Sequence, residues 1–177
     1  MNLGIFKDLV EALTLLNGLK DAKIVEDYAI GGGHAITHYE VEFSSIDLDI
    51  FAIVISEDSL RILQPIYGYF TERGYKAKRE HIYIGDVPIH ILPNVSPLHN
   101  SAVEGASKVE VEGIPTKVIG VEHLIMLSLT SFRTTDKWRI RQLLSRANSG
   151  LLNGLLDRFD DEGNKLRTRY REVLAGS

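Results

Sequence analysis

Two aspartates separated by a single residue form the pattern in the sequence that most directly suggests chemistry. Asp47 and Asp49 lie in residues 46–51, where Leu48 and Ile50 alternate with them. Side chains of a strand point to alternate faces, so the two carboxylates would project from the same face. Neighbouring carboxylates repel each other unless a cation lies between them. The pattern therefore predicts either a site for a hard, oxygen-seeking ion such as Mg²⁺ or a solvated strand face.

Three consecutive glycines precede the aspartates. Gly31, Gly32 and Gly33 end an apolar segment and lead through His34 into an expected short helix. Glycines between a strand and a helix let backbone N–H groups approach phosphate oxygens, and the helix start adds a partial positive charge. A tight structural turn uses the same residues, so this segment alone leaves both interpretations open. It is not a P-loop, because no Gly-Lys-Ser/Thr follows the glycines.

Histidines and basic residues supply the remaining candidates. Arg133 and Lys137 lie at the expected start of a helix, where they either line a cleft or are simply exposed. His81, together with His99 and His123, shows no metal-ligand spacing and is predicted to be structural or on the surface. We expect the charged residues 78–81 to form a solvated strand face.

The composition is that of an ordinary folded domain. The 177 residues are 44% hydrophobic and 25% charged, with a net charge of -4. This charge gives no general attraction to nucleic acid or acidic membranes, although basic residues cluster between 133 and 146. Without cysteine, disulfides, thiolate metal sites and cysteine nucleophiles are excluded. Because no apolar run approaches about 20 residues and the first residues do not resemble a signal peptide, we expect a cytoplasmic protein without a membrane partner.

Hydrophobic periodicity predicts the elements that would position these side chains. The expected elements, in order, are a helix over 3–17, a strand over 23–30, the short helix after the glycines, a strand over 46–55, a helix from Ser56 to Gly74, strands over 75–84 and 87–92 joined at Gly85-Asp86, a helix from Ser96, and a hairpin around Gly113. Beyond Gly120, helices are expected over 121–129, 136–147, 151–159 and 165–174. This order predicts an α+β fold, with an α/β core over 1–120 and a helical region over 121–177 packed on it.

The glycines and aspartates together carry a family resemblance. Gly32-Gly33-His34-Ala35, followed by Asp47-Leu48-Asp49, resembles the signature of the DNA polymerase β-like nucleotidyltransferase superfamily. Residues 121–125 and 133–137 are similar to the helix and the Arg-x-x-Asp segment that follow the family's core. Within the superfamily, the chain resembles small prokaryotic nucleotidyltransferase-like proteins related to the AbiEii toxins of type IV toxin–antitoxin systems. The likeness covers residues 25–147.

The resemblance implies a nucleotidyltransferase-like mixed sheet flanked by helices, with an all-helical C-terminal region. It further implies transfer of a nucleoside monophosphate from an NTP to RNA, protein or a small molecule, with Mg²⁺ or Mn²⁺ as cofactor. A toxin-like role with a cognate antitoxin is a special case of this activity. The implied nucleotide-binding residues are Gly32, Gly33, His34, Arg133 and Lys137, and the implied metal ligands are Asp47 and Asp49.

The chain departs from the family pattern at the third carboxylate, which normally lies on a later strand facing the aspartate pair. His90 occupies the best matching position and completes the predicted catalytic set with Asp47 and Asp49. Neutral imidazole suits transition metals better than Mg²⁺ and removes one negative charge. Phe43 and Ser45 also replace the Arg and Thr that often precede the aspartates. These departures leave a second hypothesis open, a non-catalytic nucleotide- or partner-binding module that retains the fold.

Overall fold

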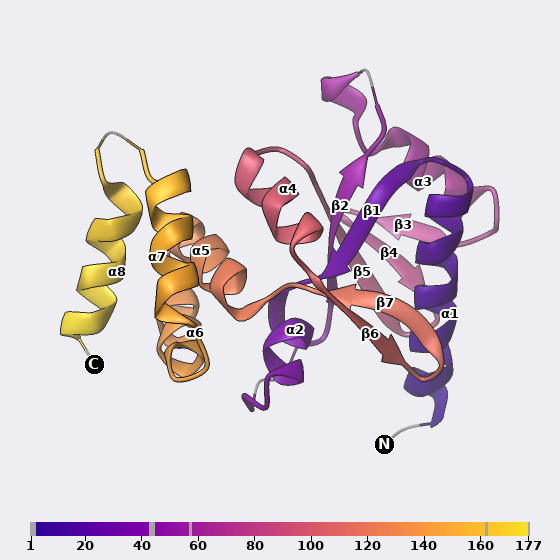
Figure 1. The fold of residues 1–177 in the computed structure, drawn as a ribbon. Helices are drawn as coiled ribbons and strands as arrows, with labels where there is room; N and C mark the ends of the chain where they lie inside the picture. Colours follow the sequence, from indigo (N-terminus) through magenta and orange to yellow (C-terminus); the bar gives the residue numbers. More distant parts are fainter. Residues whose placement is uncertain (1–2, 43–44, 57, 162, 177) are drawn as a thin grey trace.

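The computed structural model describes residues 3–42, 45–56, 58–161 and 163–176 (Figure 1). Its centre is a mixed sheet with the strand order β3-β4-β5-β2-β1-β7-β6. The strands are β1 (Val25–Ile30), β2 (Leu48–Val54), β3 (Lys76–Lys78), β4 (His81–Ile84), β5 (Val87–Pro93), β6 (Ser107–Val111) and β7 (Ile114–Val118). The helices are α1 (Leu3–Asp21), α2 (Gly32–His38), η1 (Ser59–Arg61), α3 (Gln64–Thr71), α4 (Pro97–Glu104), α5 (Val121–Ser131), α6 (Thr134–Leu144), α7 (Ser149–Phe159) and α8 (Lys165–Ala175).

Strand β2 is the middle strand of this sheet and carries the aspartate pair at its beginning. It pairs antiparallel with β1 and parallel with β5. Leu48 and Ile50 are fully buried, whereas Asp49 between them is only partly covered. Side chains of a strand alternate between its faces, so Asp49 points away from the side of the sheet that Leu48 and Ile50 bury. Phe51, on the same face as Asp49, is nevertheless buried.

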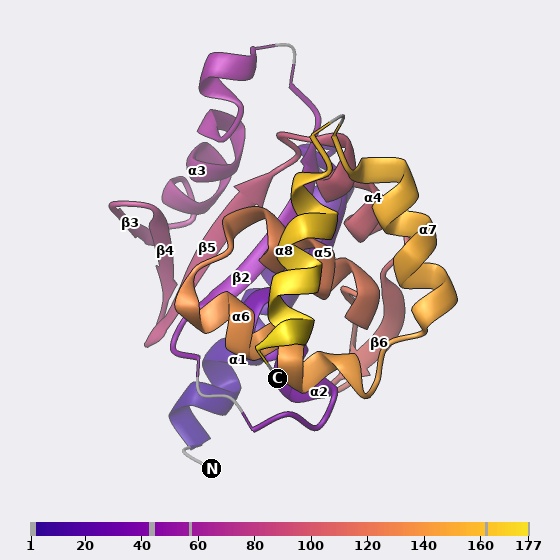
Figure 2. The same cartoon turned by 90° about the vertical axis from the view of Figure 1, so that its left-hand side faces the viewer.

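Helices cover both faces of the sheet. Helix α1 packs against β1, β4, β5 and β7 on one face, while α4 contacts β1 and β2. Figure 1 shows α4 and the C-terminal helices on the side of the sheet opposite α1, and Figure 2 shows α5 to α8 standing in front of it. No helix among the described residues is both long and apolar enough to cross a membrane.

The predicted α+β class, the mixed sheet and the C-terminal helices are confirmed. Two of the predicted elements are each divided in the structure. The expected strand over 75–84 is two strands, because Arg79 has a positive φ of 56° and turns the chain between β3 and β4. The expected helix after Ser56 is a 3₁₀ turn followed by α3, since Pro65 favours the first turn of a new helix. A division into separate units at residue 120 stays a prediction.

Candidate active site

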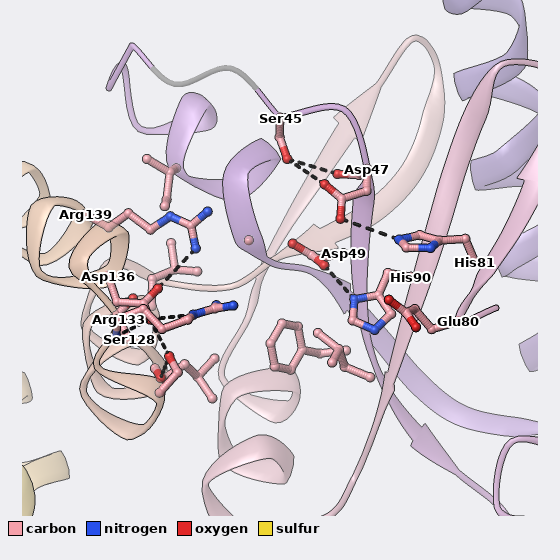
Figure 3. A pocket seen from close by; sticks show the side chains of 17 residues that line it. Ser45, Asp47, Asp49, Glu80, His81, His90, Ser128, Arg133, Asp136 and Arg139 are labelled. Atoms are coloured by element: carbon pink, nitrogen blue, oxygen red, sulfur yellow. Dashed lines mark hydrogen bonds and ion pairs between the residues drawn. The ribbon is translucent and has the colours of Figure 1, made fainter.

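Three neighbouring strands place a row of polar side chains on one face of the sheet. Asp49 on β2 is the register partner of His90 on β5, and His90 is in turn the partner of His81 on β4. Side chains at directly opposed positions share a face, so these three groups gather at the same place (Figure 3). Asp47 lies just before β2 and points to the same place.

The contacts within this row are short and polar. His90 Nδ1 lies 3.1 Å from Asp49 Oδ1, and His81 Nε2 lies 3.7 Å from Asp47 Oδ2. Ser45 Oγ donates to Asp47 Oδ1 over 3.1 Å. Asp47, Asp49 and His90 each offer a ligand atom within 4.8 Å of the others, so these three side chains could hold a metal ion. Two oxygens and one imidazole nitrogen form a plausible donor set for a divalent cation.

The electrostatics of the site follow from these contacts. Burial alone would raise the pKa of Asp47, but hydrogen bonds with its own backbone and Ser45, together with His81, outweigh burial and hold this pKa below its usual range. The hydrogen bond with Asp49 raises the pKa of His90; burial opposes this effect, and the nearby carboxylates add to it. The site therefore favours positive charge beside its carboxylates.

The glycines at the start of α2 are explained in part by the packing of the site itself. Gly32 adopts a positive φ of 53°, and a Cβ atom there would overlap the carboxylate of Asp49. The N–H of Gly31 donates to the backbone oxygen of Asp49 over 2.9 Å. The glycine turn thus makes room for Asp49, and contact of these glycines with a phosphate stays a prediction.

Helices α5 and α6 supply the opposite wall of a pocket of about 570 Å³. Its basic residues are Arg133 and Arg139, and both bind Asp136, which is only 1% exposed. Asp136 accepts hydrogen bonds from the backbone N–H and Nε of Arg133 and from Ser131 Oγ. Burial alone would raise the pKa of Asp136, but these bonds outweigh burial and lower it. A fixed carboxylate therefore positions two guanidinium groups facing the aspartate–histidine row.

The structure brings together some of the residues predicted from the sequence and not others. The predicted residues that line the pocket are Gly32, Asp47, Asp49, His90 and Arg133.

Three predicted nucleotide-binding residues are not among those that line the pocket: Gly33, His34 and Lys137. Gly33 is buried within α2, and the buried Nδ1 of His34 has no hydrogen-bond partner among the described residues. Lys137 turns to Glu172, with Nζ 2.6 Å from its carboxylate. Phe43, named as a departure from the family pattern, lies outside the described residues.

His81 was predicted to be structural or on the surface, and in the structure it lines the pocket. We expected one long strand over 75–84, so we did not predict the turn before His81. Because of this turn, His81 is the first residue of β4. A signal was present, because a hairpin turning at Gly85-Asp86 pairs residue 81 with residue 90. The pocket residues Glu80 and Arg139 were also missed. A spacing of six residues does not place Arg139 on the same face of a helix as Arg133, so the sequence contains no signal that both arginines line the pocket.

We compared the sequence and the structure with those of known proteins. No protein-family model and no curated protein matches the sequence. A crystal structure of an antigenic nucleotidyltransferase-like protein from Paracoccidioides brasiliensis is 16% identical, with a TM-score of 0.54 over 88% of this chain and 89% of that one. The protein has the nucleotidyltransferase fold.

Two structures of the antibiotic-resistance factor ANT(2'')-Ia show the same nucleotidyltransferase fold. The solution structure has a TM-score of 0.50 at 16% identity and covers 94% of this chain and 97% of that one. The crystal structure in complex with adenylyl-2''-tobramycin has a TM-score of 0.51 at 16% identity and covers 92% of this chain and 98% of that one. At this identity the likeness concerns the fold alone, and it confirms the nucleotidyltransferase-like fold that was expected from the resemblance of the glycine and aspartate motifs.

Proposed function

We propose that the protein binds an NTP together with a divalent cation, Mg²⁺ or Mn²⁺, and transfers its nucleoside monophosphate to an acceptor. The attacking hydroxyl of the acceptor forms a bond to the α-phosphorus, the bond between the α- and β-phosphates breaks, and pyrophosphate leaves. The observation that carries this proposal is the convergence of Asp47, Asp49 and His90 in a pocket that has guanidinium groups on its opposite wall. The fold supports the proposal, because the proteins with similar structures include a nucleotidyltransferase-like protein and a resistance factor solved with an adenylylated compound.

The roles proposed for the side chains follow from their positions. Asp47, Asp49 and His90 would hold the cation, which when bound supplies charge neutralisation at the phosphates and activation of the attacking hydroxyl. Arg133 and Arg139 face this cluster and would bind phosphate oxygens through their N–H donors. No side chain in this arrangement needs to form a covalent intermediate. The protein would act by positioning the reactants and stabilising developing charge.

The acceptor is proposed as a class rather than a compound: RNA, protein or a small molecule. One similar structure holds adenylyl-2''-tobramycin, an adenylylated small molecule, which supports keeping small molecules in this class. The sequence resemblance to AbiEii-related proteins supports a toxin-like role with a cognate antitoxin. That role predicts growth arrest when the protein is expressed alone, relieved when the partner is co-expressed; unimpaired growth of the expressing cells would contradict it.

A transfer assay with α-labelled NTPs tests the proposed activity. The protein is incubated with each NTP, Mn²⁺ or Mg²⁺, and RNA, protein and small-molecule acceptors. We expect label on one acceptor class with the wild type and none with the Asp47→Asn/Asp49→Asn double variant. Glu110→Gln is the matched control, because Glu110 is an exposed carboxylate on β6 outside the pocket. Transfer that persists in the double variant would exclude the proposed catalytic role.

The second candidate function is a nucleotide- or partner-binding module without transfer. It is favoured by the imidazole of His90 at the side of Asp49, where the family pattern has a third carboxylate. This candidate predicts metal-dependent NTP binding that the double aspartate variant loses, with no labelled product from any acceptor. Label on an acceptor that depends on both aspartates rules it out.

A further inference from the structure

The polar row across β2, β5 and β4 contains two histidines side by side. The rings of His81 and His90 have centroids 5.4 Å apart and come from register partners on adjacent strands. Each ring is close to a different aspartate, His90 to Asp49 and His81 to Asp47. The site therefore presents two adjacent imidazoles, each paired with its own carboxylate.

Two separations in this row are compatible with ligands of one ion. Two ligand atoms bound at about 2.1 Å and at right angles lie about 3.0 Å apart, and on opposite sides of the ion about 4.2 Å apart. His90 Nδ1 and Asp49 Oδ1 are 3.1 Å apart, near the first value. His81 Nε2 and Asp47 Oδ2 are 3.7 Å apart, between the two values. His81 lies outside the group of three side chains whose ligand atoms all lie within 4.8 Å of one another, so its ring has to move toward the ion to become a ligand.

A donor set with two nitrogens changes which ion the site prefers. Mg²⁺ takes oxygen ligands and keeps several waters, whereas imidazole suits first-row transition ions. The imidazole nitrogens therefore favour a transition ion over Mg²⁺.

We propose that His81 joins Asp47, Asp49 and His90 as a fourth ligand, and that this two-histidine, two-aspartate site selects a first-row transition ion over Mg²⁺. This inference rests on the metal site of the proposed function and names the class of metal that it takes. It also gives His81 a direct role as ligand, distinct from that of a residue that merely positions Asp47.

Titration of the metal-free protein with single metals tests the selectivity. We expect affinity to increase from Mg²⁺ to Mn²⁺ to Co²⁺, with Mn²⁺ bound at least about tenfold more tightly than Mg²⁺. The double variant His81→Asp/His90→Asp should reduce or reverse the difference in affinity between Mn²⁺ and Mg²⁺. His38→Ala is the control, since His38 is an exposed histidine outside the pocket. Equal affinity for Mg²⁺ and Mn²⁺ in the wild type would overturn the proposed selectivity.

Pulsed electron paramagnetic resonance of the Mn²⁺-loaded protein counts the imidazole ligands directly. The wild type should show nitrogen couplings from two imidazoles, and His81→Ala should retain one. A single coupled imidazole that is unchanged in His81→Ala shows that His81 only positions Asp47, and the inference fails while the proposed function stands. Two coupled imidazoles in a protein that binds no NTP would leave the inference standing and overturn the proposed function.

Discussion

At the scale of the residue, the site depends on glycine at position 32, where any side chain would collide with Asp49. The carboxylate of Asp49 occupies the space that a Cβ on residue 32 would need, and Gly32 also has a positive φ. The sequence suggested either a phosphate loop or a turn for these glycines, and neither interpretation included the approach of Asp49. That contact depends on how β1 and β2 pair, which the residue types alone do not specify.

Replacing Gly32 by alanine should therefore do two kinds of damage. The positive φ costs about 1 kcal/mol of folding free energy, and the overlap with Asp49 adds to it. Moving Asp49 should also weaken metal binding at least about tenfold, within the range reported for disturbed metal ligands. Thermal unfolding and metal titration measure the two effects.

Gly113→Ala is the matched control for this substitution. Gly113 also has a positive φ, 78°, but a Cβ there meets nothing within 4 Å. It should lose similar backbone stability and keep the wild-type metal affinity. Equal metal affinity in the two variants would contradict the role assigned to Gly32.

At the scale of the element, strong periodic patterns were predictable and turns within apolar or charged runs were not. The alternation around Asp47 and Asp49 correctly predicted β2. The helix start at Ser96-Pro97 correctly predicted α4. The turn at Arg79 was missed because a non-glycine residue there adopts a positive φ, which residue type does not signal. Missing that turn hid the place of His81 beside His90.

The first turn of α6 depends on Asp136. Its buried carboxylate caps the helix and holds Arg133 and Arg139 at the pocket. Asp136→Asn keeps the shape but removes the charge that pairs with both guanidinium groups. We expect a loss of about 1–3 kcal/mol in unfolding free energy, the usual cost of losing hydrogen bonds to a charged group, because Arg133 is largely exposed and stays solvated. Urea denaturation measures this loss.

The same substitution should weaken NTP binding more than it weakens binding of the metal alone, because it releases the arginines and leaves the aspartate–histidine row in place. Asp157→Asn serves as the control, since it breaks an exposed ion pair with Arg167 on α8. A stability loss for Asp136→Asn no larger than that of this control would contradict the role given to Asp136.

At the scale of the whole molecule, the sequence predicted the fold class and the residues of the site better than their arrangement. The motifs named the aspartates and His90, and these three side chains do lie together. The strand order that joins β2 to β5, with α3, β3 and β4 between them in the chain, depends on long-range pairing. So does the closure of the pocket by α5 and α6, which places Arg139 in it.

A cluster of ion pairs that connects α1, β1 and β7 makes the stability of the molecule depend on pH. Asp27 binds Lys20 at 2.7 Å and Lys117 at 2.9 Å. Burial alone would raise the pKa of Asp27, but these hydrogen bonds outweigh it and lower the pKa. Asp27 therefore stabilises the fold above its unfolded pKa of about 3.9, and this contribution is lost as the pH falls through its lower folded pKa.

Asp27→Asn should therefore reduce stability by about 1–3 kcal/mol at neutral pH and by less near pH 3. Urea midpoints measured at both pH values for the wild type and the variant test this expectation. A variant whose deficit is the same at both pH values would contradict the assigned ion pairs.

Calorimetric titration of an NTP in the presence and absence of Mn²⁺ tests whether nucleotide binding depends on a metal ion at the aspartate pair. We predict binding to the wild type only with the ion present, and its loss in Asp49→Asn, which keeps the shape of the side chain beside Gly32 but removes its charge. NTP binding that needs no divalent ion, or that is unchanged in Asp49→Asn, would contradict the account.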